Sequence, residues 1–494
     1  MDQRGRRRGL GRRPLPTHYD RLPGARAQFG TQVLVDSSIA TVPARAWLGA
    51  SGRDLAADAE RRAEDLLRMN RGVLRDMQVE GQVMRVRGEP AIKFATSTRI
   101  GAIPLVSPIS GRPDFGLVVE PRFSWTGLGD VLATTGFRVL PDLLPLAELP
   151  QSERHIPPWV LASVVLFRLE RLLEQSARRF VITEAETPVP KGTVDWTKYS
   201  TQRMPVGQFL TVPSRFPDLR DDEPLRAAIH WTAKRQKEAL LAAPSGGLIA
   251  RRLIGLADRL IARLSGVPPR RPTPQLLQHW KTHPLGGRVY AEGVDAIEWT
   301  IDERGLAGLS DLSGLAWRLD METFFEAWTE CIAEAIALRI GATLKVGRRG
   351  DTRIRLNWRP SFAGSLQSLL PDAVLLREGL VIVLDAKYKR HARDIMRLGW
   401  RDTPEVVREQ HRYDLHQMLA YLGVYEAERH IGLLVYPCEL DEWAELVDRG
   451  LDLVTAQVQS RGRTTSVARV SVPFGGPLDR VVDRLLSGLS PMLS

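Results

Sequence analysis

Cysteine is scarce in this chain: among its 494 residues only Cys331 and Cys438 carry a thiol. Neither belongs to a cluster with metal-ligand spacing, which argues against a zinc site and against a disulfide-rich secreted domain. The chain also lacks an apolar run near the ~20 residues that cross a bilayer, and its basic start is not followed by the apolar stretch of a signal peptide. We therefore expect a cytoplasmic protein without a membrane partner.

Several motifs of DNA-handling proteins are missing as well. There is no G-x-x-x-x-G-K-[ST] phosphate loop, no zinc-finger spacing, no clear helix-turn-helix and no internal repeat. Because the phosphate loop is what holds the nucleotide in many motor proteins, this chain is not expected to be an NTP-driven motor itself. Any engine or sequence reader that it needs would be a separate protein.

Acidic residues are outnumbered, since 69 Lys and Arg against 58 Asp and Glu leave a net charge of +11. Such a balance suits a polyanionic partner, although an arginine-rich, GC-rich genome would also produce it. Residues 1–13 hold six arginines against one aspartate, which indicates a basic arm that touches phosphates or a plain solvated tail. Between Thr352 and Arg359 basic and apolar residues alternate, which predicts a strand whose basic face meets a DNA backbone or solvent. The basic positions of that strand are Arg353, Arg355 and Arg359.

The most informative segment, residues 371–389, contains two apolar runs on either side of Glu378-Gly379. Val, Ile and Leu dominate both runs, so a β-hairpin with a two-residue turn is predicted. Counting outward from that turn places Asp372 directly opposite Asp385, with Lys387 on the same face. Two close carboxylates repel unless a cation lies between them, and Mg²⁺ favours carboxylate oxygens. The hairpin therefore predicts a metal site whose lysine orients or deprotonates a bound water, the alternative being an ordinary exposed hairpin.

Two helices are predicted to flank this hairpin. Downstream, the segment from Pro404 to about Glu426 carries polar residues at spacings of four, three and four, which share one helical face. Upstream, Asp320 is a plausible N-cap for a helix from Met321 to about Ile340, with an apolar stripe and a glutamate stripe. Either polar stripe could instead be a solvated face. The residues concerned are Gln410, Asp414, Gln417 and Tyr421 downstream, and Glu322, Glu326, Glu330 and Glu334 upstream.

Asp372, Asp385 and Lys387 together resemble the active-site pattern of PD-(D/E)xK nucleases, and Gln417 with Tyr421 is similar to the QxxxY signature of their RecB-like members. The resemblance implies an α/β fold, with a C-terminal nuclease core in which helices flank a mixed central sheet and an α+β region ahead of it. It implies that the two aspartates ligate Mg²⁺, with Mn²⁺ possible, and that Gln417 and Tyr421 support the lysine. It also implies one further metal ligand from the upstream helix. The first candidate is Glu326 and the second is Glu330.

A wider resemblance covers most of the chain. The C-terminal part is similar to McrC, the nuclease subunit of McrBC modification-dependent restriction systems, and two upstream stretches resemble the opening of McrC chains. The family implies double-stranded DNA as substrate and a separate McrB-like AAA+ GTPase as partner, which translocates the DNA in an oligomer with this subunit. The C-terminal stretches are Met321–Trp328, Leu370–Leu376, Val383–Lys389 and His416–Tyr421, and the upstream ones are Arg99–Leu105 and Val118–Phe123. A looser similarity runs from Val189 to Phe216.

Composition and periodicity divide the chain into a basic, partly irregular arm (1–50), a small α+β module (51–125), a mainly helical middle region for partner docking (126–312) and a nuclease domain (313–494). The whole predicts a Mg²⁺-dependent DNA endonuclease subunit of a prokaryotic restriction or anti-phage defence system. A RecB-like repair or end-processing nuclease would use the same site and stays open. A non-catalytic DNA-binding or motor-stimulating scaffold with a nuclease fold stays open too.

Overall fold

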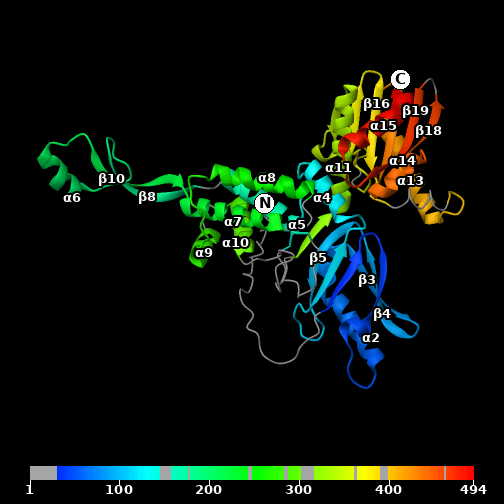
Figure 1. Cartoon of the computed structure of the whole chain (residues 1–494), viewed down its shortest axis with the longest axis horizontal. Coiled ribbons are helices and arrows are strands. Elements are labelled where there is room, and N and C mark those ends of the chain that lie inside the picture. Colours follow the sequence, from blue (N-terminus) through cyan, green and yellow to red (C-terminus); the bar gives the residue numbers. More distant parts are fainter. Residues whose placement is uncertain are drawn as a thin grey trace.

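Three parts make up the molecule: an N-terminal α+β part, a helical middle with a long projecting arm, and a C-terminal α/β part (Figure 1). The computed structural model describes residues 30–144, 157–175, 178–242, 247–282, 287–301, 316–360, 364–389, 399–460 and 463–493. The basic arm expected at residues 1–13 lies outside these ranges. Within them, no helix combines the length and the apolar character needed to cross a bilayer.

The N-terminal part contains two sheets with a shared apolar core. One sheet has the order β1-β6-β5-β11-β7, and the other has the order β2-β4-β3, with helices α1 (Ala44–Leu48), α2 (Leu55–Met69) and α3 (Arg71–Asp76) packed beside them. The segment expected to be irregular up to residue 50 is therefore structured from residue 30 onward. The first sheet comprises β1 (Gly30–Val35), β6 (Phe115–Glu120), β5 (Arg99–Leu105), β11 (Trp317–Asp320) and β7 (Asp142–Leu143), and the second β2 (Ile39–Pro43), β4 (Glu89–Thr96) and β3 (Val79–Val86).

Strand β11 precedes the C-terminal part in the chain but belongs to the N-terminal sheet. It pairs with β5, although more than two hundred residues separate the two strands. It leads directly into the first helix of the C-terminal part, whose N-cap is Asp320 as the sequence predicts. The sheet of the N-terminal part is therefore tied to the C-terminal part by one continuous segment of chain.

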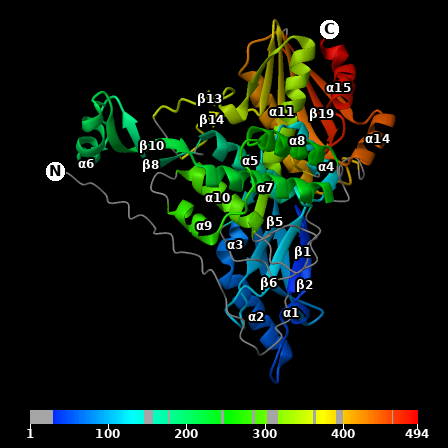
Figure 2. The same ribbon diagram turned by 60° about the vertical axis from the view of Figure 1, so that its left-hand side comes forward.

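The middle part is a helical bundle from which an arm projects. Its helices share one continuous apolar core with the C-terminal part. The arm is a long antiparallel pair of strands, β8 and β10, extended by the short β9 and by short helices at its tip (Figures 1 and 2). The sequence predicts the helices of this middle region but not this sheet. The elements are α4 (Trp125–Thr134), α5 (Trp159–Gln175), β8 (Arg178–Thr187), β9 (Thr193–Val194), α6 (Trp196–Lys198), β10 (Val212–Asp221), α7 (Glu223–Ala242), α8 (Leu248–Arg263), α9 (Pro274–Lys281) and α10 (Arg288–Ile301).

The C-terminal part is a six-stranded mixed sheet with the order β12-β15-β16-β17-β19-β18. The central pairs β16·β17 and β17·β19 are parallel and the others are antiparallel. Helices α11 (Met321–Ile340) and α15 (Leu478–Leu493) cover one face and α13 (Glu405–Gly423) covers the other. Sequence reasoning missed α14 (Leu440–Asp448) and β18. The strands are β12 (Thr343–Val346), β15 (Ala373–Arg377), β16 (Leu380–Ala386), β17 (Arg429–Cys438), β18 (Leu453–Ser460) and β19 (Arg463–Pro473).

The side chains of β16 alternate between two apolar cores, so the strand is buried on both faces. Ile382 and Leu384 belong to the large core beneath α11, whereas Val381 and Val383 belong to the core beneath α13. A strand buried on both sides reads as a continuous apolar run, which is the pattern that the sequence displays here. The same alternation decides on which face each polar residue at the end of the strand emerges.

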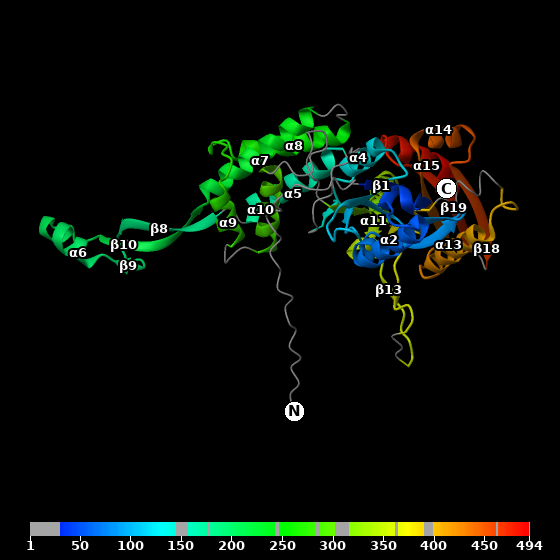
Figure 3. The same cartoon turned by 90° about the horizontal axis from the view of Figure 1, so that it is seen from below.

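A narrow flap leaves the sheet between β12 and β15. It is formed by β13 (Ile354–Arg355) and β14 (Ser368–Leu369), and it extends away from the body (Figure 3). The strand predicted from Thr352 to Arg359 is thus only two residues long in its paired portion. The predicted alternation holds only for the first part of this segment: the basic positions are exposed and Ile354 and Leu356 are half-buried, but Trp358 on the expected apolar face is exposed as well.

Candidate active site

The hairpin formed by β15 and β16 has the predicted register. Arg377 pairs with Leu380 and Ala373 pairs with Leu384, so the next position outward sets Asp372 opposite Asp385. Gly379 occupies the turn with φ of +68°, a conformation that favours glycine. The turn chemistry therefore fixes which residues face each other at the open end of the hairpin, about five residues away.

Asp372 is held from several directions. Its Oδ2 accepts a hydrogen bond from the Ala386 N–H at 2.7 Å, and its carbonyl oxygen accepts one from the Gly347 N–H at 2.7 Å. The Thr352 hydroxyl donates to the carbonyl of Pro371 at 2.6 Å. A Cβ atom on residue 347 would lie 2.6 Å from that Pro371 oxygen, so only glycine permits this close approach. The base of the flap is thus fastened to the segment that carries Asp372.

Asp385 and Lys387 form a close ion pair beside it. The lysine Nζ lies 2.5 Å from Oδ2 of Asp385, and Asp385 is 3% exposed. Within the described part of the chain, this Oδ2 accepts no hydrogen bond of suitable geometry, so the charge of Lys387 is its partner.

Burial and mutual repulsion set the electrostatics of these groups. Burial, followed by the charges of Asp385 and Glu326, raises the pKa of Asp372 well above its usual range. Burial also raises the pKa of Asp385, although Lys387 opposes the shift. Burial lowers the pKa of Lys387, but attraction to Asp385, Asp414 and Asp372 outweighs that effect and leaves the pKa raised. The site therefore combines the protonated Lys387 with two carboxylates that repel each other.

Helix α13 brings the QxxxY pair against the lysine. Gln417 Oε1 accepts a hydrogen bond from Lys387 Nζ at 2.8 Å, and Gln417 Nε2 donates to the Tyr421 hydroxyl at 2.7 Å. The Tyr421 hydroxyl in turn donates to the carbonyl of Leu370 at 3.4 Å. The four-residue spacing places both side chains on one face of the helix. This chain of contacts holds the ammonium group together with Asp385.

A second lysine is anchored in the same way, and sequence reasoning gave it no role. Lys389 Nζ lies 2.7 Å from Oδ1 of the fully buried Asp414, whose Oδ2 accepts a hydrogen bond from the Tyr436 hydroxyl at 3.2 Å. The sequence places Asp414 on the predicted polar face of the helix. The strand period of two places Lys389 on the same face as Lys387, so these two patterns together could have identified the second lysine.

The two glutamate candidates on α11 differ in their surroundings. Glu330 is buried and accepts two hydrogen bonds from Arg348, each of 2.5 Å, with Arg138 3.6 Å away. Glu326 is half-buried, and burial together with the neighbouring glutamates, against opposition from Arg348, raises its pKa to about 7. Glu326 also raises the pKa of Asp372, so the two carboxylates are near enough to repel each other. Glu326 therefore stays the candidate ligand of α11.

The carboxylates of the site can be set against the ligands that a metal ion requires. In the ranges that the structure describes, no group of three His, Cys, Asp or Glu side chains is gathered tightly enough to hold an ion. Mg²⁺ commonly takes one or two protein carboxylates and completes its shell with waters and substrate phosphates. The pair of aspartates at the open end of one hairpin fits that requirement.

The predicted DNA-contacting arginines emerge at the same end of the sheet. Arg353, Arg355 and Arg359 are exposed on the flap, whose base at Thr352 is hydrogen-bonded to Pro371 beside Asp372. The indole N–H of Trp358 donates to the carbonyl of Leu366 at 2.8 Å and ties the two sides of the flap together. The flap thus carries positive charge outward from the edge of the aspartate pair.

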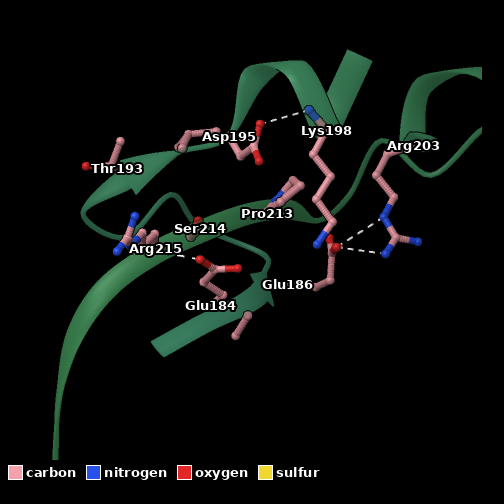
Figure 4. A pocket seen from close by; sticks show the side chains of 11 residues that line it. Glu184, Glu186, Thr193, Asp195, Lys198, Arg203, Pro213, Ser214 and Arg215 are labelled. Carbon is pink, nitrogen blue, oxygen red and sulfur yellow. Dashed lines mark hydrogen bonds and ion pairs between the residues drawn. The ribbon is translucent and has the colours of Figure 1, made fainter. Parts of the chain in front are cut away.

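A separate pocket of about 470 Å³ lies in the arm (Figure 4). Arg203 and Glu186 form an ion pair of 2.7 Å across it, and Asp195 accepts a hydrogen bond from the Lys198 N–H at 2.9 Å. None of the predicted site residues lines the pocket. Figure 1 places it on the opposite side of the molecule from the hairpin.

Comparisons with known proteins bear on the whole chain. A sequence model of the family described as "McrBC 5-methylcytosine restriction system component" matches residues 159–437, which include the hairpin and α13. No curated protein matches. Among solved structures, a refined half-complex from a tetradecameric assembly of Thermococcus gammatolerans McrB AAA+ hexamers with bound McrC is 16% identical, with a TM-score of 0.41, over 93% of this chain and 100% of that one. The cryo-EM structure of the Thermococcus gammatolerans McrBC complex is 14% identical, with a TM-score of 0.24, over 64% of this chain and 89% of that one.

Proposed function

This chain belongs to the family of McrBC 5-methylcytosine restriction system components, and we propose that within such a system it is the McrC-like subunit that hydrolyses the phosphodiester bonds of DNA. The observation that carries the proposal is the convergence of Asp372, Asp385 and Lys387 at the open end of one hairpin. The mixed sheet between α11 and α13 supports it, because PD-(D/E)xK nucleases place their acidic pair and lysine on such a core.

We infer that Asp372 and Asp385 hold Mg²⁺, or Mn²⁺ in its place, and that Glu326, which is not gathered with them in the free protein, becomes a further ligand when the ion binds. When bound, such an ion neutralises charge on the scissile phosphate and lowers the pKa of a water ligand. The aspartates supply hard oxygen donors, and because burial raises the pKa of both, a bound cation would stabilise their ionised forms.

Lys387 would act on the attacking water and on the charge that develops at the phosphate. Its ammonium group is fixed between Asp385 and Gln417, so it reaches the reaction already oriented. Tyr421 keeps Gln417 in place. Lys389, anchored by Asp414, adds a second positive charge on the same face. These residues account for positioning and charge stabilisation, which are the main contributions that a protein makes to phosphoryl transfer.

The flap would hold the DNA backbone against this centre. Its arginines can neutralise phosphates, and each such contact releases counterions, so binding should depend steeply on salt. Replacing Arg353, Arg355 and Arg359 together with alanine should lower the slope of log affinity against log salt concentration by up to about 2.7, that is, about 0.9 for each lost contact. Fluorescence anisotropy of a labelled duplex measures the slope. Arg377→Ala, at the opposite end of the hairpin, should leave it unchanged, and an unaltered slope in the triple variant would remove the flap from the DNA interface.

The arm would dock the McrB-like AAA+ partner. Its tip carries exposed apolar side chains, among them Leu210, which is 88% exposed, and Phe209, and an isolated projection with an apolar end marks an interaction site. Leu210→Asp combined with Phe209→Asp should abolish the complex with the partner, as judged by size-exclusion chromatography. Leu241→Asp, a similarly exposed leucine of α7, is the control that should retain it. Co-elution of the arm variant with the partner would assign docking to another surface.

A cleavage assay tests the function itself. The chain is incubated with methylated plasmid DNA, with Mg²⁺ or EDTA, and with or without the McrB-like NTPase from the same genome. Internal double-strand breaks that need both Mg²⁺ and the partner support the proposal. Degradation only from DNA ends would instead indicate an end-processing nuclease. Stimulation of the partner's nucleotide hydrolysis without any DNA cleavage would indicate a scaffold.

A further inference from the structure

Tyr388 stands between the two lysines of the site and points away from them. Lys387 and Lys389 contact residues of α13, whereas Tyr388 lies on the other face of the same segment, within the core shared by α11 and the N-terminal part. Its hydroxyl donates a hydrogen bond of 3.0 Å to Oδ2 of Asp36, a residue 352 positions earlier in the chain. The segment that carries both lysines is therefore fastened to the N-terminal sheet.

The acceptor of this bond is itself rigidly placed. Asp36 follows β1 and is fully buried, and its Oδ1 accepts a hydrogen bond of 2.6 Å from the Arg122 N–H. Its own N–H donates to the carbonyl of Glu120 at 2.9 Å. The Asp36 carboxylate thus bridges the end of β1, the end of β6 and the tyrosine hydroxyl.

Arg122 completes the cluster. Its guanidinium carbon lies 4.2 Å from the centre of the Tyr388 ring, and its Nε lies 3.8 Å from Oδ2 of Asp36, with the arginine side chain only 4% exposed. A desolvated arginine over an aromatic face is held more strongly than one at the surface. Phe123 next to it contacts the same ring edge-on, with centroids 5.8 Å apart. The Val118–Phe123 stretch, which has no role in the proposed site itself, thus contacts the segment that follows β16.

We propose that the cluster of Asp36, Arg122 and Tyr388 is a positioning device, through which the N-terminal sheet sets Lys387 and Lys389 for cleavage. Beyond Ala386 the segment is no longer part of the ladder, and its backbone is held by the Lys387 N–H bond to Val435 O at 2.8 Å. Tyr388 therefore supplies the fixed point that prevents this end from rotating or sliding. Any partner or DNA that shifts the N-terminal sheet would shift both ammonium groups with it.

This inference rests on the proposed nuclease function, and it is tested with the full chain in the presence of its NTPase partner. Tyr388→Phe keeps the ring and the arginine contact and removes only the hydroxyl. We expect the cleavage rate constant at saturating DNA to fall about tenfold, because a lysine misplaced by a fraction of an ångström stabilises the transition state less well. The DNA concentration at half-maximal rate should stay within twofold.

Tyr290→Phe is the matched control. Tyr290 is 5% exposed in α10 and Tyr388 is 4% exposed, so both substitutions remove a buried hydroxyl, but only one lies beside the lysines. The two variants should show similar thermal unfolding, and Tyr290→Phe should cleave at the parental rate. Equal losses of rate in both variants would reduce the cluster to a packing role and overturn the inference.

A second pair of variants tests whether the residues of the cluster act together. Asp36→Asn should slow cleavage at least as much as Tyr388→Phe, since it also removes the charge that faces Arg122, and the double variant should be no slower than Asp36→Asn. Additive losses would contradict a shared device. A parental chain that fails to cut with Mg²⁺ and partner would overturn the proposed function, whereas a parental chain that cuts and a Tyr388→Phe variant that cuts equally well would overturn this inference alone.

Discussion

Asp385→Asn is expected to lower the rate of DNA cleavage by at least about a thousandfold while the protein stays folded. The substitution preserves shape and removes the charge that would hold the metal ion. Metal-assisted charge stabilisation is worth several kcal/mol, and each 1.36 kcal/mol corresponds to a factor of ten in rate. Lys387→Ala and Asp372→Asn should cause losses of the same order. Single-turnover cleavage of plasmid DNA with Mg²⁺ and the NTPase partner measures the effect.

Stability measurements distinguish lost chemistry from lost structure. Because burial and neighbouring charge raise the pKa of Asp372, its ionised form opposes folding at neutral pH when no metal is bound. Asp372→Asn can still accept the bond from the Ala386 N–H, so in EDTA it should unfold at the parental temperature or above it. Asp351→Asn, an exposed neighbour at the base of the flap, should change neither rate nor stability. Parental cleavage by both Asp385→Asn and Lys387→Ala would sink the assignment of the site.

Local periodicity was sufficient to predict how the candidate residues lie relative to one another. The turn at Glu378-Gly379 fixed the register, and the period of two then determined that Asp372, Asp385 and Lys387 share a face. The period of α13 placed Gln417 and Tyr421 on the face that meets the lysine. These inferences succeeded because each depended on residues close together in sequence, where backbone geometry leaves few choices.

Long-range features could not be predicted in this way. The bond between Tyr388 and Asp36 joins residues 352 positions apart, and no local pattern announces it. The arm was missed for a related reason: its strands bury little, so they lack the strict alternation of a half-buried sheet. The sequence ranks Glu326 ahead of Glu330 as a candidate ligand but cannot predict their different surroundings, since residues four apart share one helical stripe. Only the location of Arg348, brought by η3 (Gly347–Arg349) at the base of the flap, separates their roles.

The buried ion pair between Arg348 and Glu330 predicts a large effect on stability. Glu330 is 2% exposed, and Arg348 neutralises it through two hydrogen bonds of 2.5 Å, whereas Arg138 remains 3.6 Å away. Removing one partner of a buried ion pair leaves an uncompensated charge, which costs about 3 kcal/mol. Arg348→Met should therefore lower the unfolding temperature of the C-terminal part by roughly 6–12 °C, the range expected for a domain of this size. Differential scanning fluorimetry detects such a shift, and Arg349→Met in the same short helix should produce none.

The double variant Glu330→Met with Arg348→Met distinguishes a structural role of Glu330 from a role as a metal ligand. Replacing both charges with apolar side chains removes the desolvation penalty together with the pair, so the double variant should be more stable than Arg348→Met alone. If Glu330 only fastens α11 to the base of the flap, the double variant should cleave DNA within a few-fold of the parental rate at 20 °C. Glu326→Gln, by contrast, should slow cleavage by about tenfold or more, because it removes a carboxylate that acts on Asp372. A folded double variant without cleavage would transfer the role of ligand from Glu326 to Glu330.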